Sequence, residues 1–276
     1  MMRRLHRACL LLTLSAGTTF ACNPPEAAPT TPPAGGDATP ADPADATDDG
    51  ATETAELPAA EEVLAKSLDA VGGKDAILAI KSSYLEGKMT ISAQNLGGTL
   101  KVWTKGDNSY VESNIDGVGM SQMWKKGDEM WTKDPIQGLR KLEGKEADQA
   151  KWSSDPILAA NWNKYFDKAE TARISEGEGG RKVIEVELTS EGGDTVTLMF
   201  DSETFMPVGQ QFTQETQMGK MPIRTTLSDF REIAGVKIPF KSTSDMGVVE
   251  SEQTTDKYEV NVEIDDKKFE PPKAKK

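Results

Sequence analysis

The side chains that most often carry enzyme chemistry are scarce and gathered at the start of this chain. The 276 residues include one histidine, His6, and two cysteines, Cys9 and Cys22. Imidazole and thiolate groups supply many nucleophile–base pairs and most structural zinc sites. Whether the protein can use either chemistry therefore depends on whether its first residues are retained.

The segment that holds these residues has the layout of a secretory signal. Three arginines begin it, a short leucine-rich run follows at 10–14, and small residues lead to Cys22. The apolar run is too short to span a bilayer. A cysteine directly after Ala21 resembles the lipobox of bacterial lipoproteins. We expect residues 1–21 to be a lipoprotein signal peptide and Cys22 to be lipidated; the alternative is an ordinary signal cut nearby that leaves the thiol free.

Cleavage before Cys22 would leave a mature chain with no histidine and no free thiol. This composition excludes nucleophiles paired with histidine, zinc sites built from thiolates and imidazoles, and intrachain disulfides. Adjacent acids remain at 48–49, 61–62 and 265–266, where a tether, a helix face and a loop are expected. Such pairs are usually solvated. We therefore expect no catalytic residue, no metal ligand and no cofactor.

One stretch has the spacing of a calcium loop. Asp45, Thr47, Asp49, Gly50 and Glu56 occupy its positions 1, 3, 5, 6 and 12. A threonine is the wrong ligand at position 3, and the prolines before the stretch prevent the helix that would lead into it. An acidic tether is the better interpretation.

Charge is unevenly distributed along the chain. Removing residues 1–21 takes away three arginines and no acid, so the formal charge of −13 becomes −16. Residues 23–57 hold eight acids, seven prolines and no lysine or arginine. This composition buries too little apolar surface to fold, so we expect 22–57 to be a disordered acidic tether behind the lipid anchor. The excess of negative charge makes nucleic acid an implausible partner.

A folded domain is expected over 58–272, followed by a basic tail at 273–276. Residues 59–71 form an amphipathic helix pattern that ends at Gly72 and Gly73, and a short helical piece follows near 77–80. A second helical pattern covers 144–168, where Asp155 and Pro156 could start a helix.

Between and after these helices the sequence alternates with the period of strands. The alternating stretches are 85–91, 100–102, 184–188, 196–200, 236–240 and 260–264, with further strands near Tyr110, Met123 and Trp131. We expect a mainly β (α+β) domain of about ten or eleven antiparallel strands in meander order.

Several segments together resemble the outer-membrane lipoprotein-sorting proteins, the LolA- and LolB-like family. The resemblance runs over about 59–272 and rests on AEEVLAKSLDAVGGKDAI, KKGDEMWTKDPIQG, TLMFDSETFMPVGQQF, DFREIAGVKIPFKSTSDMG and NVEIDDKKFEPP, in that order. It implies a strongly curved antiparallel half-barrel whose concave face is covered by the N-terminal and inserted central helices. It also implies a cavity for acyl chains.

The apolar residues are compatible with such a cavity. Methionine is frequent, and it adapts to ligands of varied shape because it is unbranched and polarisable. Any one of these side chains could equally be part of a packed core. The residues we expect to line a ligand cavity are Met123, Trp131, Trp162, Leu198 and Phe200.

These patterns predict a membrane-tethered protein without enzymatic activity that binds a lipid or a lipidated protein. Asn23 is not the aspartate that retains enteric lipoproteins at the inner membrane, so the outer membrane, facing the periplasm, is the expected location. The alternative is an interaction module of an envelope protease or secretion complex, with a solid interior and an exposed sheet edge that binds protein. The protein partner cannot be named from these residues.

Overall fold

The computed structural model describes residues 57–92, 95–216, 219–247 and 249–272. The expected signal peptide, the Cys22 anchor, the tail at 273–276 and all but the last residue of the expected tether lie outside the described residues. Among the residues described, no helix combines the length and the apolar character needed to cross a membrane.

Two helices open the described part of the chain, α1 (Ala60–Ala70) and α2 (Gly73–Ala79). Val63 and Leu64 of α1 are fully buried, as its amphipathic pattern predicts. The corner between the helices requires glycine, because a Cβ at Gly72 would lie 2.1 Å from the carbonyl oxygen of Gly235. There the N–H of Lys237 donates to the carbonyl of Val71 at 2.8 Å, which fixes the helices to the sheet.

The strands form one antiparallel sheet. They are β1 (Ser82–Ile91), β2 (Leu96–Lys105), β3 (Asn108–Ile115), β4 (Gly119–Lys126), β5 (Glu129–Asp134), β6 (Gly138–Lys141), β7 (Lys168–Glu176), β8 (Lys182–Thr189), β9 (Thr195–Asp201), β10 (Pro207–Thr216), β11 (Gly219–Ile233), β12 (Val236–Asp245) and β13 (Glu250–Val260).

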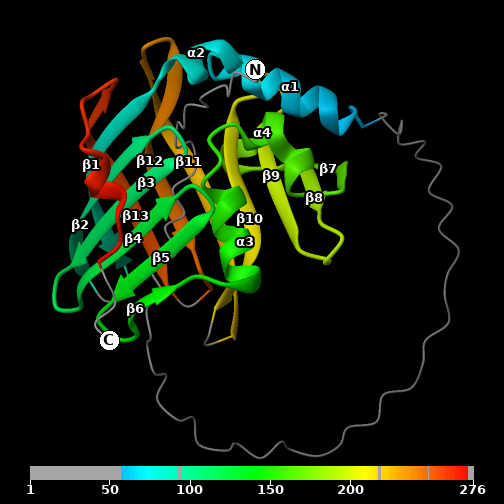
Figure 1. Ribbon diagram of the computed structural model, residues 1–276. Helices are drawn as coiled ribbons and strands as arrows, with labels where there is room; N and C mark the ends of the chain where they lie inside the picture. The colour runs from blue at the N-terminus through cyan, green and yellow to red at the C-terminus, as the bar shows by residue number, and fades with distance from the viewer. Residues whose placement is uncertain (1–56, 93–94, 217–218, 248, 273–276) are drawn as a thin grey trace, which may run out of the picture. The chain divides into compact units, whose positions relative to one another are not determined.

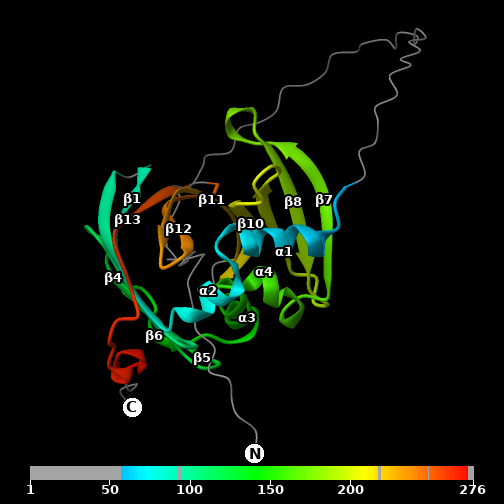
Figure 2. The ribbon, with the colours of Figure 1, turned by 90° about the horizontal axis from the view of Figure 1, so that it is seen from above.

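Neighbours in the sheet are neighbours in the chain everywhere except at the pair of β1 and β13. The sheet therefore has two meanders, β1–β6 and β7–β13, that meet at this seam. Its edges are β6 and β7, and no pairing between them closes a barrel. The sheet curves around the helices, which lie inside the curve (Figures 1 and 2).

The chain passes from one edge strand to the other through three short helices, α3 (Gly144–Ser153), α4 (Leu158–Asn161) and the 3-10 helix η2 (Trp162–Lys164). Asp155 acts at the start of α4, since its carboxylate accepts the N–H of Ile157 at 3.0 Å. The helical region expected at 144–168 is thus divided into pieces, and α3 packs against β10.

The meander, the open curvature and the covering helices agree with the expected half-barrel, but the strand count is thirteen rather than ten or eleven. The four residues of β6 are too few to show alternation. The edge strand β7 is mostly exposed and polar, so it lacks an apolar pattern. The apolar alternation at 260–264 was wrongly assigned to a strand, because β13 ends at Val260.

The outer face of the first meander carries a row of aromatic side chains. Register places Tyr84, Trp103, Tyr110, Trp124 and Trp131 opposite one another on five consecutive strands. The C-terminal 3-10 helix η4 (Asp266–Phe269) packs over this row, and Phe269 is 1% exposed. Figure 2 shows η4, in red, outside the curve of the sheet, whereas α1 to α4 lie inside it.

Candidate functional site

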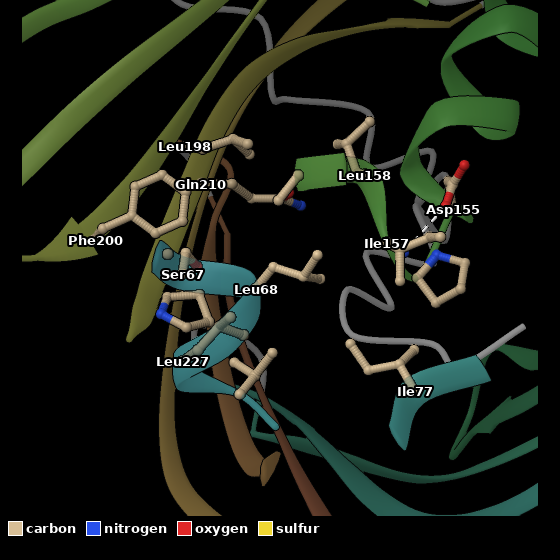
Figure 3. Close-up of a pocket in the computed structure, with 15 residues that line it drawn as sticks. Ser67, Leu68, Ile77, Asp155, Ile157, Leu158, Leu198, Phe200, Gln210 and Leu227 are labelled. Carbon is tan, nitrogen blue, oxygen red and sulfur yellow. Dashed lines mark hydrogen bonds between the residues drawn. The ribbon is translucent and has the colours of Figure 1, made fainter. Parts of the chain in front are cut away.

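A small apolar cavity lies between the helices and the inner face of the second meander (Figure 3). Its volume is about 70 Å³. The helices α1 and α2 and the start of α4 form one wall, and β9, β10 and β11 form the other. We call these three helices the helical layer. The lining residues are Ser67, Leu68, Val71, Ile77, Asp155, Pro156, Ile157, Leu158, Ala159, Leu198, Phe200, Pro207, Gly209, Gln210 and Leu227.

The lining side chains of each wall share a face because of the periodicity of the strand or helix that carries them. Leu198 and Phe200 are two residues apart on β9, so both side chains point to the inner face. Leu68 of α1 and Val71, directly after the end of α1, are three residues apart, and both line the cavity. Leu198 and Phe200 lie across the cavity from Ile157 (Figure 3).

Polar groups in the wall are few, and the carboxylate of Asp155 is engaged within the protein. Besides the N–H of Ile157, it accepts hydrogen bonds from Asn161 Nδ2 and from the hydroxyl of Tyr165, each at 2.9 Å. These bonds tie the connection between α3 and α4 into one unit. Two other polar residues of the lining are more deeply buried, with 1% of Gln210 and 3% of Ser67 exposed.

Of the five residues expected to line a cavity, the structure brings Leu198 and Phe200 together in this wall. Trp162 packs against the neighbouring core cluster that contains Leu64, Leu158 and Phe166.

The other two expected residues, Met123 and Trp131, do not lie together. Met123 is opposite Thr132 in the register, whereas Trp131 is opposite Trp124, so their side chains point to opposite faces of the sheet. Met123 is on the inner face of β4, outside the lining of the cavity. Trp131 belongs to the aromatic row of the outer face and packs against the cluster that contains Phe269.

Most of the residues of the helical layer that line the cavity could not be identified from the sequence. The amphipathic pattern at 59–71 places Leu68 and Val71 on its apolar face, but it cannot show that a cavity separates them from the sheet. Ile157 and Leu227 carried no comparable signal. Gln210 could have been noticed as a polar residue two positions from Phe212 on an apolar strand face.

Comparison with known proteins gives matches at the level of structure. No protein-family model and no curated protein sequence matches the chain. Similar crystal structures include a DUF1329 family protein from Desulfovibrio piger, with a TM-score of 0.54 at 14% identity, covering 78% of this chain and 98% of that one.

Two further structures are similar. A LolA superfamily protein from Nitrosomonas europaea has a TM-score of 0.52 at 17% identity and covers 78% of this chain and 99% of that one. An outer-membrane lipoprotein-sorting protein domain from Vibrio parahaemolyticus has a TM-score of 0.51 at 11% identity and covers 76% and 95%. The described domain therefore shares the fold of these three structures, a strongly curved and open antiparallel sheet.

Proposed function

We propose that the protein binds a lipid, or the acyl chains of a lipidated protein, between its helical layer and the inner face of its sheet, and that binding and release are its whole activity. The observation that carries the proposal is the apolar cavity lined by α1, α2, α4 and β9–β11. The similarity of fold to a lipoprotein-sorting domain supports it.

The cavity in this structure is smaller than a site that could hold a whole acyl chain. Ligand pockets usually measure about 300–1,000 Å³, whereas this one measures about 70 Å³. A whole acyl chain therefore requires the helical layer to move away from the sheet. Burial of the chain would favour that movement by about 0.8 kcal/mol per methylene.

Binding without chemical conversion is consistent with the groups in the wall. Asp155 is the one carboxylate among the lining residues, and it already accepts three hydrogen bonds from neighbouring donors. Its geometry suits the positioning of a loop. A catalytic carboxylate has to exchange a proton with a substrate, whereas the Asp155 carboxylate is bonded to neighbouring protein groups.

The proposal places the domain in the bacterial envelope, tethered through a lipid on Cys22 and facing the periplasm from the outer membrane. The signal layout and the cysteine after Ala21 support this location. Labelled palmitate should be incorporated into the wild-type protein and not into Cys22→Ser. Equal labelling of both proteins would contradict anchoring at Cys22.

Uptake of a fluorescent fatty acid by the detergent-free mature protein tests binding. Ala159 lines the cavity on α4, so Ala159→Leu should fill it and weaken uptake by about tenfold, which corresponds to about 1.4 kcal/mol. Ala65→Leu places the same side chain on the exposed face of α1 and should leave uptake unchanged. No uptake by the wild type, or equal uptake by all three proteins, would contradict the proposal.

The alternative of a protein-interaction module requires an interior with no room for a methylene chain. The cavity favours lipid binding over that alternative. The edge strand β7 nevertheless presents Ile174, which is 41% exposed, and remains the place where a protein partner could pair with the sheet.

A further inference from the structure

A second, polar hollow adjoins the apolar cavity. It measures about 320 Å³ and lies between the connection from α3 to α4 and the turns that join β2 to β3 and β4 to β5. Asp155, Pro156 and Ile157 line both hollows, so a single stretch of chain separates them. An amphiphile with its tail in the apolar cavity could therefore place its head group in the polar hollow.

The floor of the hollow is fixed by the protein itself. The N–H of Gly127 donates to Asn108 Oδ1 at 3.1 Å, which joins the two turns. Lys125, on the inner face of β4, donates from Nζ to the hydroxyl of Ser154 at 2.8 Å. That bond connects the sheet to the end of α3, so the position of the Lys125 ammonium is determined by two elements.

Three lysines and three aspartates line this hollow, and most of them have partners within the protein. Lys151 pairs with Asp148 at 2.9 Å, and Asp155 accepts the three hydrogen bonds described above. Asp107 and Lys164 also interact within the protein. These four groups are therefore poor candidates for a ligand.

Lys125 differs from them. It is half-buried, and among the described residues its ammonium has the neutral hydroxyl of Ser154 as its hydrogen-bond partner and no carboxylate within 4.0 Å. An ammonium has three donors, so two remain for another acceptor. A partly buried cation is stabilised by an anion, and phosphate oxygens form short, charge-assisted hydrogen bonds with it.

We propose that the bound lipid is a phospholipid whose phosphate is held by Lys125 while its acyl chains enter the adjoining apolar cavity, widened by movement of the helical layer away from the sheet. This inference rests on the proposed lipid-binding function and specifies its ligand. Asp128, on the exposed turn between β4 and β5, faces the same hollow and would accept a hydrogen bond from the amine of an ethanolamine head group. The hollow thus selects a phospholipid over a neutral diacylglycerol with the same tails.

The test compares dipalmitoyl phosphatidylethanolamine with dipalmitoylglycerol, which has the same acyl chains and no phosphate. Each lipid is presented in vesicles to the mature protein, and the lipid retained after separation is measured by mass spectrometry. Diacylglycerol lacks the charge-assisted hydrogen bond to phosphate, so the wild type should retain the phospholipid at least about tenfold better, which corresponds to about 1.4 kcal/mol.

Variants separate the head-group site from the tail site. Lys125→Gln should lose the preference and retain diacylglycerol as the wild type does, which also shows that the variant is folded. Lys125→Arg, which keeps the charge, should keep the preference. Lys88→Gln removes an outward-facing lysine whose side chain is 71% exposed, and it should behave as the wild type.

The outcomes distinguish this inference from the function on which it rests. Equal retention of both lipids, or an unchanged preference in Lys125→Gln, would overturn the phosphate site and leave lipid binding standing. Retention of neither lipid would overturn both.

Discussion

At the scale of single residues, partly buried polar groups position the chain. The Asp155 carboxylate accepts hydrogen bonds from a backbone N–H, an amide and a phenol. These bonds hold the stretch of chain that lines both the apolar cavity and the polar hollow. Three tyrosines have similarly specific surroundings. Tyr84 donates to Glu86 and Tyr110 donates to Glu112 on the outer face, whereas Tyr258 lies opposite Leu85 on the inner face.

The first prediction concerns the ionisation of these tyrosines. Burial, followed by the hydrogen bond to Glu86, raises the pKa of Tyr84 to about 12. Burial is also the main cause that raises the pKa of Tyr110 and of Tyr258 to about 12. The unfolded chain should release these protons near pH 10. Between pH 10 and 12 the native state then binds more protons, so the free energy of unfolding should fall as the pH rises through this window.

Ultraviolet absorbance titration of folded and urea-unfolded protein measures this difference directly. Three phenols should ionise near pH 12 in the folded protein and near pH 10 in the unfolded one. Tyr84→Phe should remove one of the late transitions. Coincident curves for the two states would show that the raised pKa values are wrong.

At the scale of elements, the sheet depends on the seam where its two meanders meet. The register of β1 and β13 shifts between Glu86 and Gly87. At that point the backbones approach so closely that a Cβ at Gly87 would lie 2.1 Å from the carbonyl oxygen of Thr254. The two strands can therefore approach this closely only because residue 87 has no side chain.

The second prediction follows from this contact. Gly87→Ala should force the two strands apart and lower the free energy of unfolding by about 1–3 kcal/mol, as overpacking does in cores. Gly97→Ala is the control, because a Cβ there would meet the carboxylate of Asp116 at an ordinary 3.4 Å. Urea denaturation of the two variants measures the effect, and similar midpoints for both would contradict the role of the seam.

At the scale of the whole domain, α3 connects the two meanders across the open side of the sheet. Arg140 of β6 forms a bidentate salt bridge with Glu146 of α3, with nitrogen to oxygen distances of 2.6 and 2.7 Å. On the other side, Gln149 donates to the carbonyl of Thr213 and accepts the N–H of Glu215 on β10. The pairing with β9 extends no further along β10 than Phe212, so this amide replaces a missing strand partner.

The third prediction tests that connection. Gln149→Ala should leave two backbone groups of β10 without their partner and lower the free energy of unfolding by about 1–3 kcal/mol. It should also speed the release of a bound fluorescent fatty acid, because α3 would hold the meanders together less firmly. Asp148→Ala, at an exposed neighbouring position, is the control for both measurements. If Gln149→Ala is destabilised but releases the fatty acid at the wild-type rate, the expected effect of α3 on ligand release is wrong.

The sequence by itself determined most of the elements and which chemistry a processed chain would lack. Alternation with period two identified the main strands, the pattern at 59–71 identified α1, and the composition after Cys22 excluded histidine-based catalysis in a processed chain. The element assignments are confirmed because they depend on neighbouring residues, whereas the exclusion of histidine chemistry depends on cleavage before Cys22 and stays a prediction. Period two also shows that Leu198 and Phe200 share a face.

Only the tertiary structure decided which face is concave and which elements cover it. Met123 and Trp131 looked equivalent in sequence, yet they point to opposite faces, and η4 covers the one that carries Trp131. The apolar cavity is formed by segments that range from Ser67 to Leu227 in the chain, and the hollow around Lys125 by segments from Leu78 to Tyr165. Alternation along one strand cannot show which distant segment will pack on it, because that choice depends on the curvature of the whole sheet and the path of the helices.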